Sequence, residues 1–95
     1  QSLLLMNSSF TMDASRQLAT LCFRMYPSEQ ESQIREFYQR ILSRAPDQQE
    51  QIDCIEFLSS QTQLLRQQGE PRPALTAAMD LCRAMFNCNE FLYVD

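Results

Sequence analysis

The stretch of sequence that decides the fold is the last one, ALTAAMDLCRAMFNCNEFLYVD, residues 74–95. Apolar residues recur there at three- and four-residue spacing, which predicts an amphipathic helix that ends in a polar turn. Four consecutive apolar residues follow at positions 91–94. Chain ends are usually polar and frayed, so we expect this one to dock into the core. Its predicted structural anchors are Asn87, Phe91 and Val94, with Phe91 and Val94 on one face of a further helical turn.

Working backwards, the sequence predicts three more helices that receive this stretch. The main helices are expected to begin near residues 11, 28, 47 and 73, after a short leading helical piece at Gln1–Met6. Prolines at 27 and 46 and the lone Gly69 mark their ends. Two capping boxes are expected, Ser28 with Glu31 and Asp47 with Glu50. The predicted fold is all-α, a compact bundle of four main helices with a docked C-terminal tail.

Each predicted helix carries one apolar stripe at helical spacing. The clearest period lies in the second helix, and the third stripe has Cys54 beside it. The four predicted stripes are Ala14, Leu18, Leu21, Cys22 and Met25; Ile34, Phe37, Tyr38, Ile41 and Leu42; Ile52, Ile55, Leu58, Thr62 and Leu65; and Leu75, Ala78, Met79, Cys82, Met85 and Phe86.

Composition limits the chemistry more sharply than the fold. Ninety-five residues predict one helical domain spanning residues 1–95, and its 44% hydrophobic content can fill a single core. The eight basic residues are all arginine, and there is no histidine. Imidazole catalysis, imidazole metal ligation, lysine Schiff bases and C-x-x-C-H haem attachment are therefore excluded. We expect no cofactor, no metal site and no catalysis by this chain alone.

The expected partners follow from charge and hydropathy. A net charge of −4 gives little support to a surface that follows nucleic-acid phosphates. The apolar run Leu3–Met6 is far shorter than the roughly 20 residues of a membrane span. The chain begins inside a helical pattern, so we expect it to be the C-terminal part of a longer protein whose other domains are its partners. The sequence does not set its oligomeric state.

Four cysteines allow three interpretations. A zinc site is disfavoured because no C-x-x-C pair exists. Disulfides could join Cys22 to Cys54 or Cys82 to Cys88, and the sequence does not fix the connectivity. Buried thiols are favoured for Cys22 and Cys82, which lie on apolar stripes. Cys88 sits in a polar turn, so it is the candidate reactive thiol and the centre of a weaker redox hypothesis.

We expect the charged side chains to stabilise the helices or to face solvent, and not to form a catalytic site. The carboxylates are few and open or flank helices, where solvation and the helix dipole explain them. Glu31 with Arg35 and Glu36 with Arg40 are predicted i, i+4 ion pairs on solvated faces. No candidate catalytic residue is assigned.

The two ends of the chain, QSLLLMNSSF at residues 1–10 and NCNEFLYVD at residues 87–95, form a distinctive combination. They resemble the C-terminal domain of a large planctomycete family of cytochrome-associated proteins of unknown function. The proline break at Ala45-Pro46-Asp47, together with the helices before and after it, is also similar to that family's R-x-P-x-x-x-E linker. Cys88 stands where the family pattern has Ser or Thr, so the resemblance implies no thiol function. It implies an exported or periplasmic protein with a cytochrome segment upstream, and no catalytic residues.

Two functional hypotheses follow. The first is a non-catalytic structural or interaction module that closes a larger exported, cytochrome-linked protein, and it predicts no polar cleft among the helices. The alternative is the helical part of an enzyme active site completed by upstream residues. That alternative predicts arginine and carboxylate side chains converging on a pocket that opens toward the upstream part.

Overall fold

Proline-containing turns divide the chain into four helices. The computed structural model describes residues 2–3, 8–88 and 93–94. In chain order its elements are β1 (Ser2–Leu3), α1 (Ser8–Met25), α2 (Gln30–Leu42), α3 (Gln48–Gln67), α4 (Pro73–Asn87) and β2 (Tyr93–Val94). The predicted all-α fold of four main helices is confirmed.

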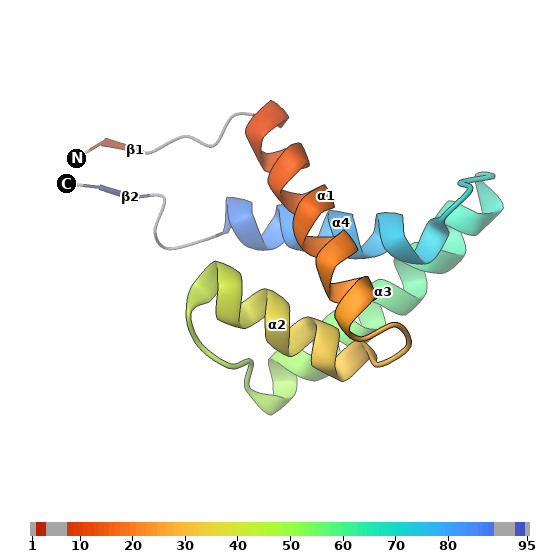
Figure 1. Ribbon diagram of the computed structural model, residues 1–95, viewed down its shortest axis with the longest axis horizontal. Helices are drawn as coiled ribbons and strands as arrows, with labels where there is room; N and C mark the ends of the chain where they lie inside the picture. Colours follow the sequence, from red (N-terminus) through yellow and green to blue (C-terminus); the bar gives the residue numbers. More distant parts are fainter. Residues whose placement is uncertain (1, 4–7, 89–92, 95) are drawn as a thin grey trace.

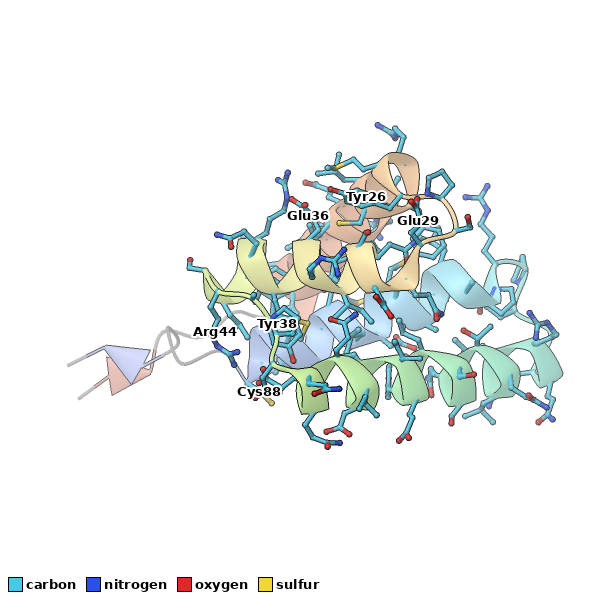
Figure 2. The ribbon with its side chains drawn as sticks, turned by 90° about the horizontal axis from the view of Figure 1, so that it is seen from below. Tyr26, Glu29, Glu36, Tyr38, Arg44 and Cys88 are labelled. Atoms are coloured by element: carbon cyan, nitrogen blue, oxygen red, sulfur yellow. The ribbon has the colours of Figure 1, made fainter. Side chains whose placement is uncertain are left out.

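Helix α4 lies at the centre of the arrangement. It packs mainly against α1 on one side and α3 on the other, and α1 crosses it steeply (Figure 1). Helix α2 packs against α1 and α3 and runs antiparallel to α3 (Figure 2). Because the connection between α1 and α2 is short, the start of α2 lies close to the end of α1. Both lie at the end of the bundle remote from β1 and β2 (Figures 1 and 2).

The chain ends differ from the sequence prediction. Ser2 and Leu3 form a strand rather than a leading helical piece, and they pair antiparallel with β2, Ser2 opposite Val94 and Leu3 opposite Tyr93. A helix this short forms too few hydrogen bonds to repay its nucleation, whereas strand pairing satisfies backbone groups of both ends. Val94 is thus extended, which rules out the helical turn proposed for it. Phe91 and most of the predicted docked tail lie outside the described residues.

The core matches the prediction best in α2. Ile34, Phe37, Tyr38 and Ile41 are all buried, as their helical spacing predicted. The described helices share one cluster, whose buried apolar members are Ala19, Cys22, Ile34, Phe37, Tyr38, Ile41, Cys54, Leu58, Ala77, Ala78, Leu81, Cys82 and Met85.

Helix α1 is rotated about its own axis relative to the prediction. The buried residues of α1 are Thr11, Ser15, Ala19 and Cys22, while the predicted Met25 is exposed. These side chains are small, and α4 likewise buries Ala77, Ala78 and Cys82 toward its neighbours. Small residues on both helices favour a close crossing, in which larger side chains lie at the flanks.

Helix α3 turns most of its predicted stripe inward, since Leu58 is buried and Ile55 and Leu65 pack against the core. Cys54 and Leu58 are its buried residues, whereas the predicted Ile52 is exposed. The exposure of Ile52 leaves an isoleucine on the outer surface of α3.

A side-chain cap forms at the start of α3 but not at the starts of α2 and α4. At α3 the predicted capping box forms, with Glu50 N–H donating to Asp47 Oδ1 at 2.7 Å and Asp47 N–H donating to Glu50 Oε1 at 2.9 Å. At α2 the predicted box is wrong, because Glu29 occupies the N-cap position and its side chain makes no capping bond. Gly69 follows α3 with φ of 82°, in the left-handed region that glycine favours.

Candidate functional site

All four thiols are free, and three of them are buried. Cys22, Cys54 and Cys82 lie in the core, while Cys88 is exposed directly after the end of α4. Burial raises the pKa of Cys22 to about 11, with a smaller contribution from the Glu36 carboxylate. Burial also raises the pKa values of Cys54 and Cys82. These three thiols are therefore protonated and inert at neutral pH.

The residues singled out at the C-terminal end are only partly described. Asn87 is the last residue of α4 and is exposed beside Cys88. The exposure of Cys88 agrees with its proposed reactivity, which stays a prediction. The anchoring roles of Asn87, Phe91 and Val94 also stay predictions.

A cluster that the sequence analysis missed links the end of α2 to the start of α3. The Arg44 guanidinium donates two hydrogen bonds to Glu50, each 2.8 Å long, and its centre lies 5.4 Å from the Tyr38 ring centroid. The Tyr38 hydroxyl lies 3.8 Å from Cys54 Sγ. Figure 2 shows Tyr38 and Arg44 at the same end of α2. The six-residue separation of Arg44 and Glu50 across a proline turn was the available signal.

The electrostatics of this cluster indicate a structural role, in which it holds the end of α2 to the start of α3. Two hydrogen bonds from Arg44, followed by the backbone N–H of Asp47, lower the pKa of Glu50 to about 2. Burial, together with the hydrogen bond to Cys54, raises the pKa of Tyr38. At neutral pH the carboxylate is ionised and the phenol and thiol are neutral. None of these groups is poised to exchange a proton.

Of the two ion pairs predicted in α2, one forms. Arg40 Nε lies 2.6 Å from Glu36 Oε2, as predicted. Arg35 instead donates to Ser32 Oγ at 3.0 Å, and within the described part of the chain it forms no ion pair with Glu31. The Arg35 charge is therefore not neutralised by a neighbouring carboxylate.

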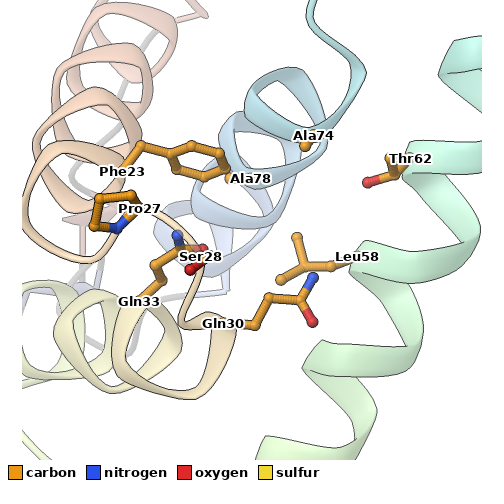
Figure 3. Close-up of a pocket in the computed structure, with 9 residues that line it drawn as sticks. All are labelled: Phe23, Pro27, Ser28, Gln30, Gln33, Leu58, Thr62, Ala74 and Ala78. Carbon is orange, nitrogen blue, oxygen red and sulfur yellow. The ribbon is translucent and has the colours of Figure 1, made fainter.

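All four helices contribute to one half-open cavity of about 250 Å³, which we call the four-helix cavity (Figure 3). In Figure 3, Phe23 extends from α1 toward Ala78 of α4, and Gln30 extends from α2 toward Leu58 of α3. The lining side chains are all uncharged: Phe23, Pro27, Ser28, Gln30, Gln33, Leu58, Thr62, Ala74 and Ala78. Of the described residues, none that lines this cavity supplies an acid, a base or a thiol.

A second concave surface, the α2–α3 groove, consists of two adjoining hollows of about 490 and 380 Å³. Both hollows share Glu31, Arg35 and Ile55, and Gln51 Nε2 donates to the Glu31 carbonyl at 3.3 Å across the groove. The groove is lined by Ser28, Glu29, Gln30, Glu31, Ser32, Arg35, Pro46, Asp47, Gln48, Gln51, Ile52 and Ile55.

The hypothesis of a structural or interaction module predicted no polar cleft among the helices. The active-site hypothesis predicted arginine and carboxylate side chains around a pocket that opens toward the upstream part. Neither prediction is met in full. Uncharged polar groups line the four-helix cavity, and charged groups line the α2–α3 groove. The part of the groove at the start of α2 lies away from β1 (Figure 2). Within residues 2–3, 8–88 and 93–94, no group of three or more potential metal ligands is gathered. No described helix has the length and apolar character needed to cross a membrane.

Comparison with known proteins gives one family. A family model described as PSD1, a protein of unknown function (DUF1553), matches residues 1–58, more than half of the 95-residue chain. The chain belongs to the DUF1553 family. No curated protein and no solved structure matches the chain significantly.

The DUF1553 match ends at Leu58, inside α3. It therefore includes α1, α2, the Arg44–Glu50 cluster and every residue that lines the α2–α3 groove. The expectation of a family of unknown function is confirmed. The DUF1553 match does not address the expected planctomycete and cytochrome context, which stays a prediction.

Proposed function

We propose that the domain is a non-catalytic structural or interaction module that closes a larger exported, cytochrome-linked protein. The family of unknown function is compatible with this role, and the similarity of residues 1–10 and 87–95 to planctomycete cytochrome-associated proteins supports the context. Its partners are the other domains of that protein.

The observation that carries the proposal is the α2–α3 groove. Ile52 is 42% exposed and lines the groove together with the partly buried Ile55. Charged groups line the same groove, among them Arg35. Protein–protein contacts combine apolar side chains with a polar rim and are enriched in arginine.

The charges of the groove define the partner. Three carboxylates, on Glu29, Glu31 and Asp47, and one guanidinium, on Arg35, line the groove. A segment that presents an apolar side chain between lysines or arginines complements this surface. The domain therefore contacts a cationic segment of the parent protein.

Two matched variants test the proposal. Ile52→Asp places a charge in the groove, and Leu64→Asp makes the same change at a residue of α3 that is 46% exposed and does not line the groove. We expect Ile52→Asp to weaken binding of the domain to the upstream part of the parent protein at least about tenfold, as loss of a central contact does. Leu64→Asp should have little effect in the same calorimetric titration. Equal effects of the two variants, or no binding by the unmodified domain, would contradict the proposal.

A further inference from the structure

The four-helix cavity has the properties of a ligand site, which the proposed interaction role does not use. Its volume of about 250 Å³ equals roughly eight water molecules at ~30 Å³ each, enough for a small organic molecule. Its wall combines apolar side chains from α1, α3 and α4 with polar groups from α2 and the preceding loop. Such a combination of an apolar body and a few convergent polar groups is typical of small-molecule sites.

The decisive polar group is Gln33. It is 2% exposed, and its Nε2 donates to the Tyr26 carbonyl oxygen at 2.6 Å, which fixes the orientation of the carboxamide. Among the described residues no donor is bonded to its Oε1, although the side chain lines the cavity. This oxygen is not one of the fully buried unpartnered atoms, so it is accessible from the half-open cavity, and a ligand that donates an N–H group can bond to it.

The rim of the cavity provides hydrogen-bond donors, whereas Gln33 provides an acceptor. Gln30 is the first residue of α2, and the N-terminus of this helix has no side-chain cap, so it retains backbone N–H donors. The hydroxyls of Ser28 and Thr62 also line the cavity. A ligand can therefore place an acceptor at the rim while it donates to Gln33.

Charge selects the class of ligand. In the part of the chain that the structure describes, no charged side chain lines the cavity, so a buried ammonium or carboxylate would lose its hydration without a counter-charge. A primary amide is neutral, donates through its N–H groups and accepts through its carbonyl oxygen. We propose that the four-helix cavity binds a small neutral molecule that carries a primary amide on an apolar body.

Titration of the ¹⁵N-labelled protein with benzamide tests this site by NMR. We expect saturable shifts confined to amides around the cavity, among them Gln33, Thr62 and Ala78, and to the Gln33 side-chain amide. Acetophenone has the same size but no N–H donor, and it should bind at least about threefold more weakly. Benzoate carries a charge and should bind at least about tenfold more weakly.

A pair of alanine variants locates the site. Ala74 is exposed and lines the cavity, so Ala74→Leu fills the cavity from its rim without entering the core. Ala84 is exposed on the same helix and does not line the cavity, so Ala84→Leu is the matched control. Ala74→Leu should weaken benzamide binding at least about tenfold, and Ala84→Leu should leave it unchanged.

Three outcomes would overturn the proposal. The first is the absence of saturable shifts up to the solubility limit of benzamide. The second is binding of acetophenone or benzoate as tight as that of benzamide, the latter indicating an anion site at the start of α2. The third is equal binding by the Ala74→Leu and Ala84→Leu variants. None of these outcomes bears on the α2–α3 groove, so the two proposals fail independently.

Discussion

Replacing Ser15 by alanine is expected to stabilise the domain. Ser15 is 0% exposed in the buried face of α1, and its hydroxyl oxygen has no hydrogen-bond partner among the described residues. Most core substitutions destabilise proteins, so a gain in stability here would be a specific consequence of this unpaired hydroxyl. Alanine keeps the small volume that the crossing of α1 and α4 requires.

The size of the effect follows from two contributions. A buried polar group without a partner costs about 1–3 kcal/mol, which the alanine variant recovers. Alanine also has the higher helix propensity, by up to about 0.7 kcal/mol. The free energy of unfolding should therefore rise by about 1–3 kcal/mol. In a domain of this size each kcal/mol raises the melting temperature by roughly 4–8 °C.

Thermal and urea unfolding followed by circular dichroism measure this gain. Ser60→Ala is the matched control, because Ser60 is exposed within α3 and reports the helix-propensity contribution alone. A gain for Ser15→Ala no larger than that for Ser60→Ala would refute the reasoning. Such a result would mean that the Ser15 hydroxyl has a partner in solution.

Three further predictions concern other parts of the chain. Glu50→Gln should lower stability at pH 7 by about 0.5–2 kcal/mol. Because the folded-state pKa of Glu50, about 2, lies below its ordinary 4.5, the difference from the unmodified domain should vanish as pH falls from about 4.5 to 2 in acid titrations; a constant difference would contradict this. With a thiol reagent and mass spectrometry, Cys88 should label well before Cys22 and Cys82, and equal rates would show that burial does not protect the latter two. Deleting residues 91–95 should abolish cooperative melting if the predicted anchors hold the fold, and a truncated domain that melts within a few degrees of the intact one would exclude that role.

The helix pattern of the chain was predictable where apolar spacing and local chemistry agree. In α2 the spacing of Ile34, Phe37 and Ile41 leaves one possible buried face, and those residues are buried. At α3 the Asp47–Glu50 capping box depends only on residues three apart, and it forms as predicted. Both features are local, so they require no knowledge of the neighbouring helices.

The buried face of α1 and the exchange of Ile52 for Cys54 in α3 were not predictable by the same reasoning. A stripe assigned by hydrophobicity favours Met25 and Ile52, yet both are exposed, while Ser15 and Cys54 are buried. Which face turns inward depends on the neighbouring helices, and the small residues of α4 favour a small face on α1. The four-helix cavity and the α2–α3 groove were missed for the same reason, since each combines residues from separate helices.

The proposed role as an interaction module is tested most directly by hydrogen–deuterium exchange of the intact parent protein and of this domain alone. Contact through the α2–α3 groove predicts slower exchange in the parent at the start of α2, around Glu31 to Arg35, and in α3 around Gln51 to Ile55. The face of α3 that carries Leu64 should exchange equally in both. Identical exchange at the groove in the two proteins would contradict the proposed contact.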